Sequence, residues 1–161
     1  EVKEMKYYHY YESPIGKLVI VHNDRGITNL YLAHLLQIEN AIQEETDLIK
    51  EAVKQLDEYF NGLRQSFDLP LAPAGTHFQQ KVWQALRNIP CGKTYSYKQI
   101  AEQIGSPKAS RAIGMANNKN PILLLIPCHR VIGANGKLIG FAAGLEMKKY
   151  LLTLEGISYE C

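Results

Sequence analysis

The sequence is poor in cysteine and has no long apolar stretch. Its three cysteines, Cys91, Cys128 and Cys161, are odd in number and lack the short spacings of a metal site. We therefore expect no metal, no disulfide framework and a reducing compartment. No apolar run approaches the roughly 20 residues of a membrane span. The charged residues 1–6 also lack the apolar core of a signal peptide. These absences favour a cytoplasmic protein without a membrane partner.

Charge is distributed unevenly along the chain. Residues 1–74 hold seven Lys or Arg against twelve Asp or Glu, a net charge of −5. Residues 75–161 hold eleven against four, a net charge of +7. A basic half beside an acidic half indicates that the basic half meets a polyanion. The alternative is charge scattered over a solvated surface, and composition alone does not separate the two.

The N-terminal half predicts a small antiparallel sheet followed by a helix. β-prone runs at residues 7–11, 17–22 and 27–32 are separated by turn residues, which is typical of a three-stranded meander. From Asp47 the apolar residues recur at helical spacing, and the pair at 61–62, Asn and Gly, can end that helix.

The C-terminal half is predicted to be mainly helical. Pro and Gly in residues 68–75 mark a connection between an N-terminal domain at 1–74 and a C-terminal domain at 75–161. Capping residues and apolar spacing predict helices after Thr76, at Tyr97, near Lys108 and at Leu145. The second and third of these, joined by a Gly-Ser-Pro turn, match a helix-turn-helix, and a turn at 133–137 predicts a wing. The fold class is therefore α+β, with a small antiparallel sheet and helix followed by a mainly helical winged helix-turn-helix domain.

A cysteine followed by a histidine is the strongest chemical signal. The five apolar residues at 122–126 predict a buried strand or extended core segment that holds Cys128 at a fixed point. The thiolate is the nucleophilic form of cysteine, and a neighbouring base favours it. The alternative is a buried structural cysteine. Adjacent residues on an extended segment also point to opposite faces, so adjacency alone does not make His129 the base.

The motifs of residues 75–161 resemble those of the O6-alkylguanine-DNA alkyltransferases, also called methylated-DNA–protein cysteine methyltransferases. The matching segments follow one another in order and are Gly75-Thr76-His77-Phe78-Gln79, Val82-Trp83, Ile89-Pro90, Ser96-Tyr97, Arg111-Ala112, Asn120-Pro121, Ile126-Pro127-Cys128-His129-Arg130-Val131, Gly144-Leu145 and Leu151-Leu152-Thr153-Leu154-Glu155-Gly156. Residues 1–74 match more loosely. The resemblance implies DNA repair by a monomer that moves the alkyl group of O6-alkylguanine, and of O4-alkylthymine, irreversibly to its own cysteine. Each molecule would react once and need no cofactor.

The resemblance also implies a catalytic set. Cys128 is the nucleophile, His129 is the base that reaches it through a water, and Glu155 orients and charges His129. Asn120 braces the turn before the cysteine. Such a triad predicts a pKa for the Cys128 thiol well below the free value of about 8.5. From the residues alone, Glu155 would pass for a surface acid at a helix end and Asn120 for an ordinary turn residue.

A second implied set faces double-stranded DNA. A helix of small residues enters the minor groove, Arg111 fills the gap left by a flipped nucleotide, and Tyr97 contacts the phosphate and the flipped guanine. The further DNA or base contacts are Ala112, Gly114, Arg130, Val131, Ala142 and Lys148. Ala143 stands where some members have glycine, and its methyl group could narrow the pocket. From the residues alone, the helix of small residues could instead pack against protein. Arg111 could be an ordinary surface arginine, and Tyr97 a half-buried core tyrosine.

Two other functions stay open at this stage. A non-enzymatic relative that only flags alkylated guanine would lack the reactive cysteine, so Cys128 argues against it. A Cys-His hydrolase with an unrelated helix-turn-helix would need an oxyanion hole and would turn over repeatedly.

Overall fold

The computed structural model describes residues 4–133, 135–136, 138, 141 and 143–159. The chain divides into two compact units, Glu1–Ala74 and Gly75–Cys161. Apolar side chains are buried in each of them. In the part of the chain that is described, no helix has both the length and the apolar character needed to cross a bilayer.

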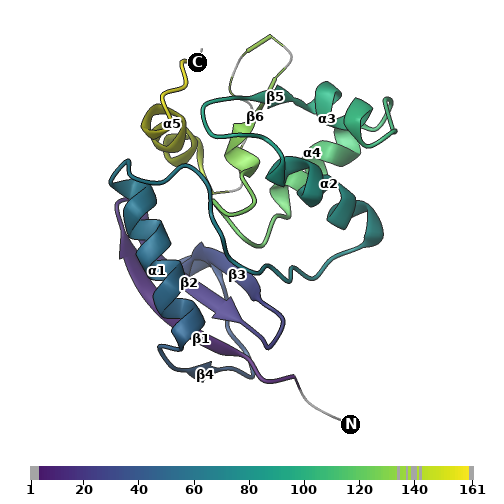
Figure 1. Ribbon diagram of the computed structural model, residues 1–161. Helices are drawn as coiled ribbons and strands as arrows, with labels where there is room; N and C mark the ends of the chain where they lie inside the picture. Colours follow the sequence, from purple (N-terminus) through teal and green to yellow (C-terminus); the bar gives the residue numbers. More distant parts are fainter. Residues whose placement is uncertain (1–3, 134, 137, 139–140, 142, 160–161) are drawn as a thin grey trace. The chain divides into compact units, whose positions relative to one another are not determined.

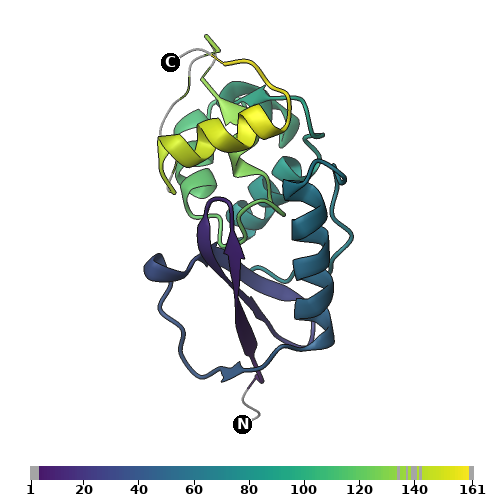
Figure 2. The same ribbon diagram turned by 90° about the vertical axis from the view of Figure 1, so that its left-hand side faces the viewer.

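The N-terminal unit is a sheet with one long helix. Strands β1 (Tyr7–Ser13), β2 (Gly16–His22) and β3 (Ile27–Leu32) form the predicted antiparallel meander, with β2 between the other two. A fourth strand, β4 (Ile42–Gln43), pairs in parallel with β1. The sequence did not indicate it, because two residues are too few to show an alternation. Helix α1 (Asp47–Phe60) packs against β1 and covers one face of the sheet (Figures 1 and 2).

Local signals fix the ends of α1 and of the connections around it. The Thr46 hydroxyl caps the first turn by accepting from the Ile49 N–H. Gly62 follows the helix with a φ of 75°, a conformation that glycine adopts without a steric cost. A short 3₁₀ helix, η1 (Ala33–Leu35), follows β3. The predicted end of α1 at residues 61–62 is therefore confirmed.

The C-terminal unit is mainly helical, as predicted. Its elements are α2 (His77–Arg87), β5 (Tyr95–Ser96), α3 (Tyr97–Gln103), α4 (Ser110–Asn118), η2 (Cys128–Arg130), β6 (Val131–Ile132) and α5 (Leu145–Leu154). Helices α2, α3 and α4 pack together, and the Trp83 indole donates to the Ala116 carbonyl at 2.9 Å, which ties α2 to α4. The η2 segment contacts both α2 and α5 (Figure 1).

The helix-turn-helix is confirmed, and part of the predicted wing lies outside the described residues. Capping boxes begin α2 at Thr76 and α3 at Ser96, and α3 contacts α4. Strand β6, one side of the expected hairpin, pairs in parallel with β5, a pairing that the sequence did not indicate. The rest of that hairpin includes positions 134, 137, 139 and 140, which lie outside the described residues.

The apolar run at 122–126 is buried, but the prediction of an extended strand is wrong. The Leu125 N–H donates to the Leu123 carbonyl at 2.8 Å, and the Ile126 N–H donates to the Ile122 carbonyl at 3.0 Å. Leu124 lies between them with a φ of 71°. This is a γ-turn in the left-handed region, which a leucine adopts only at a cost in strain. When every residue of a short segment is buried, all of them are apolar and the sequence shows no alternation. A buried turn and a buried strand therefore cannot be told apart from such a run.

Candidate active site

Asn120 fixes the turn that precedes Cys128. Its buried side chain donates from Nδ2 to the Ile126 carbonyl at 2.8 Å and accepts from the Ile122 N–H at 2.9 Å. The Cys128 N–H also donates to the Ile126 carbonyl, at 2.7 Å. On the other side, Asn117 of α4 donates from Nδ2 to the Cys128 carbonyl at 3.4 Å. The Cys128 backbone is therefore held on one side by the turn that Asn120 fixes and on the other by Asn117 of α4.

A buried cluster of charged side chains lies beside the cysteine. His129 Nε2 is 2.7 Å from Glu155 Oε2, and each of these side chains is 1% exposed. Arg130 donates from Nε to Oε1 at 2.7 Å and from Nη2 to Oε2 at 3.0 Å of the same carboxylate. Its Nη1 donates to the Ile89 carbonyl at 2.7 Å. The carboxylate at the C-terminal cap of α5 is thus fixed by both residues that follow Cys128.

These contacts define the charge and tautomer of His129. Although burial raises the pKa of Glu155, hydrogen bonds from His129 and Arg130 lower it to about 2, so the carboxylate is ionised. Burial lowers the pKa of His129, against the effect of Glu155, so the imidazole is neutral at pH 7. Because a carboxylate only accepts, Nε2 carries the ring proton and Nδ1 holds a lone pair. Nδ1 is buried without a partner among the described residues.

The Cys128 thiol is protonated in this structure. Burial raises its pKa to about 11, although a hydrogen bond from Asn120 and the charge of Lys148 act in the opposite direction. The expectation of a lowered pKa is therefore wrong for the resting site. A cysteine that is 2% exposed loses the water that would stabilise its thiolate. A base has to remove the proton before sulfur can attack.

Lys148 is held beside the cysteine by the Val131 carbonyl. The fully buried Lys148 donates from Nζ to the Val131 carbonyl at 2.7 Å, and this carbonyl follows η2 directly. Burial lowers the pKa of Lys148 to about 8, while Cys128 acts to raise it. The ring of Phe141 is 5.9 Å from the same Nζ. Lys148 is therefore a cation close to the thiol.

Tyr97 connects the cysteine to the surface of α4. Burial first, and then the charge of Cys128, raise the pKa of this half-buried phenol, so its hydroxyl is protonated. A methyl group built on Gly114 would lie 3.7 Å from the Tyr97 ring, which places the two side by side. Arg111 and Ala112 are exposed on α4. Of the expected DNA-facing residues, Tyr97 is thus close enough to Cys128 to be affected by its charge and also lies beside Gly114 of α4.

Arg130, expected to contact DNA, has its side chain in the buried cluster around Glu155 instead. It is 6% exposed, and its guanidinium is engaged by Glu155 and Ile89 rather than offered to DNA. The sequence hides this pairing, because 25 residues separate the two partners. Asn117, which holds the Cys128 carbonyl, was also missed, since nothing in its neighbourhood distinguishes it from a surface asparagine. Ala142 lies outside the described residues.

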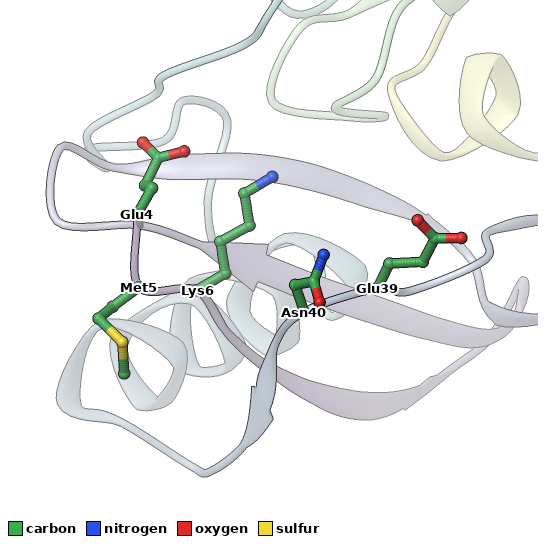
Figure 3. Close-up of a pocket in the computed structure, with 5 residues that line it drawn as sticks. All are labelled: Glu4, Met5, Lys6, Glu39 and Asn40. Atoms are coloured by element: carbon green, nitrogen blue, oxygen red, sulfur yellow. The ribbon is translucent and has the colours of Figure 1, made fainter. Parts of the chain in front are cut away.

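The N-terminal unit has a surface pocket of different character. It is lined by Glu4, Met5, Lys6, Glu39 and Asn40 (Figure 3). The side chains of Glu4, Lys6 and Glu39 point to one side of the chain, and Met5 points to the other (Figure 3). Glu4 accepts hydrogen bonds from Asn23 and Arg25. None of the lining residues is a nucleophile or a buried base.

Across the described ranges, no three His, Cys, Asp or Glu side chains converge as metal ligands.

Two family models cover most of the chain. Residues 77–157 match the 6-O-methylguanine DNA methyltransferase, DNA binding domain, and residues 6–73 match the ribonuclease-like domain of the same family. A methylated-DNA--protein-cysteine methyltransferase of Methanosarcina acetivorans is 48% identical over 93% of this chain and 98% of its own length. The constitutive methylated-DNA--protein-cysteine methyltransferase of Bacillus subtilis is 47% identical over 97% and 99%.

Solved structures agree with these matches. The Mycobacterium tuberculosis OGT in complex with DNA superposes with a TM-score of 0.87 at 45% identity, over 92% of both chains. The M. tuberculosis O6-methylguanine methyltransferase gives a TM-score of 0.86 at 44% identity, over 94% of this chain and 93% of that one. Sequence and fold therefore agree over nearly the whole length, and this chain belongs to the 6-O-methylguanine DNA methyltransferase family.

Proposed function

We propose that this protein repairs DNA by moving the alkyl group of O6-alkylguanine, and of O4-alkylthymine, onto the Sγ atom of Cys128. One observation carries the proposal. The buried His129, next to the protonated thiol, has Nε2 fixed on Glu155 and an unpartnered lone pair on Nδ1. The names of the relatives and the DNA complex of the M. tuberculosis protein support the same reaction and the same partner.

The first step is removal of the thiol proton. Nδ1 of His129 takes it from Sγ through one bridging water, which leaves a thiolate and an imidazolium. Glu155 stays ionised, because its pKa is about 2, and it stabilises the imidazolium. The hydrogen bond from Asn120 and the charge of Lys148 stabilise the thiolate. The site thus forms its nucleophile by passing the thiol proton to His129.

The second step is direct displacement at the alkyl carbon. The new C–S bond forms as the bond from carbon to O6 breaks, and its electron pair stays on the guanine. The guanine gains one proton, so that overall one proton moves from sulfur to the base. The protonated Tyr97 hydroxyl donates a hydrogen bond to the leaving base. The thioether product does not revert, and each molecule therefore reacts once.

The substrate base has to leave the duplex to meet the thiol. Cys128 is 2% exposed, so it cannot reach into a stacked helix. Extrusion costs a few kcal/mol, and less for a lesion that pairs poorly. With α4 in the minor groove, Arg111 occupies the gap that the flipped nucleotide leaves. The protein acts as a monomer, since one chain supplies the nucleophile, the base and Glu155.

The mass of the intact protein after incubation with a duplex containing O6-methylguanine tests this proposal. We expect a gain of one methyl group per molecule, mapped to the peptide that holds Cys128. The Cys128→Ser variant should gain none, and Cys91 should remain unmodified. Repeated turnover would indicate a hydrolase, and binding without transfer would indicate a non-enzymatic damage reader. Either result would overturn the proposal.

A further inference from the structure

Helix α4 exposes one large apolar side chain. Met115 is 66% exposed, whereas its neighbour Ala116 and the nearby Ile113 are buried in the core of the unit. Exposing a methionine on the surface gives up the favourable burial of its side chain. Scattered exposed apolar residues are common, so Met115 gains meaning only from its surroundings.

Met115 belongs to a continuous exposed stripe. The exposed residues of α4 and its C-terminal cap are Arg111, Ala112, Met115, Asn118 and Lys119, here called the α4 stripe. Residues four positions apart lie one above the other on a helix, about 6 Å apart along its axis. Met115 therefore stands one turn beyond Arg111, on the same face.

The positive charge of the α4 stripe favours DNA over a protein as its binding partner. Arg111 and Lys119 lie on either side of Met115, and the stripe contains no acidic residue. It belongs to the half of the chain whose net charge is +7. A protein partner would have to carry matching acidic groups around an apolar centre. A DNA minor groove offers phosphates to the two cations and apolar sugar walls between them.

We propose that Met115 is a second minor-groove contact, which packs against sugars and base edges beside the gap that Arg111 fills and holds the duplex open during base extrusion. Base pairs stack about 3.4 Å apart. A side chain one helical turn from Arg111 thus meets a neighbouring base pair rather than the gap itself. The flexible thioether of methionine suits such an irregular apolar surface. This inference rests on the proposed function, because it assumes repair of a flipped base in duplex DNA.

Truncation of Met115 tests the inference. We expect Met115→Ala to slow single-turnover repair of an O6-methylguanine duplex by about threefold to tenfold, since a partly buried apolar contact is lost. Its rate with free O6-benzylguanine, which needs no extrusion, should stay within twofold of wild type. Met115→Leu should recover most of the duplex rate, because it restores an apolar side chain of similar volume. Met5→Ala is a matched control, since Met5 is also exposed, at 52%, but lies in the N-terminal unit.

The salt dependence of duplex binding gives an independent measurement. Met115 contacts no phosphate in this arrangement, so Met115→Ala should weaken binding without changing the slope of log affinity against log salt. An unchanged duplex rate, or equal losses on duplex and free base, would overturn the role of Met115. Failure of wild-type protein to take up any alkyl group from the duplex would overturn the proposed function instead, and the two failures are therefore distinct.

Discussion

At the scale of single residues, Glu155 contributes both a negative charge and a hydrogen-bond acceptor for His129. Glu155→Gln removes the charge but keeps an acceptor for His129 Nε2. Since the imidazolium formed in the reaction loses its neighbouring anion, we expect the single-turnover rate at pH 7.5 to fall by about tenfold or more. The pKa of His129 should fall further as well, so the acid limb of the rate profile should move to lower pH. Rates measured between pH 5 and 9 check both effects.

A double-mutant cycle shows whether Glu155 acts through His129. His129→Ala should slow transfer at least as much as Glu155→Gln. The double variant should lose less than the sum of the two free-energy changes, because both residues serve one proton transfer. Additive losses, or an unshifted profile in a normally folded Glu155→Gln, would show that the reactivity of Cys128 has another source.

The Glu155 carboxylate also makes the free energy of unfolding depend on pH. In the folded state the pKa of Glu155 falls from 4.5 to about 2, because its hydrogen bonds with His129 and Arg130 outweigh burial. Folding thus favours the ionised form. This contribution is fully present above pH 4.5 and is lost as the pH falls towards 2. The difference corresponds to about 3 kcal/mol in the free energy of unfolding. Urea titrations of wild type and Glu155→Gln should show a gap that narrows between pH 4.5 and 2.5, and a constant gap would contradict this assignment.

At the scale of elements, α4 has a glycine in its interior where alanine would fit. A methyl group on Gly114 would meet the Tyr97 ring at 3.7 Å, an ordinary contact. Gly114→Ala should therefore raise the free energy of unfolding by about 0.5–1 kcal/mol, since glycine is the weaker helix former. If α4 enters the minor groove, the added methyl group should slow repair of duplex DNA more than reaction with free O6-benzylguanine. Thermal melts and the two rates test this, and a loss of stability would mean that the Tyr97 contact is tighter than it looks.

Elements defined by local chemistry were the ones that the sequence predicted. The caps at Thr76 and Ser96 depend on residues within one turn, so their sequence motifs were sufficient. The turn around Leu124 was missed, because its positive φ is imposed by the Asn120 hydrogen bonds and the surrounding core rather than by leucine. The pairing of β6 with β5 was missed because two-residue strands carry no periodic signal.

In the candidate site, too, the features that depend on neighbouring residues were the ones that the sequence predicted. Cys128 and His129 were found as neighbours in sequence, and Glu155 was found only through the family resemblance. The bond from Arg130 to Glu155 and the raised pKa of Cys128 depend on burial in the folded chain. Such effects of tertiary environment leave no local pattern.

At the scale of the whole molecule, the asymmetry of charge predicts how the protein binds undamaged DNA. The C-terminal half has a net charge of +7 and the N-terminal half −5. Binding through the basic half releases counterions from phosphates, so log affinity should fall linearly with log salt. Phosphate contacts carry no base information, and duplexes of different sequence should therefore bind alike.

Single lysine substitutions locate the surface responsible. Lys108 and Lys119 flank α4, and both are exposed. If each neutralises one phosphate, Lys108→Gln and Lys119→Gln should each reduce the magnitude of the salt slope by about 1. Lys50, on α1, is also exposed, and Lys50→Gln should leave the slope unchanged, because the acidic half repels the duplex. Fluorescence anisotropy with one labelled duplex from 50 to 300 mM salt measures all four proteins. Equal slopes in every variant would mean that DNA binds somewhere other than the helix-turn-helix, and a loss confined to Lys50→Gln would place it on the N-terminal unit.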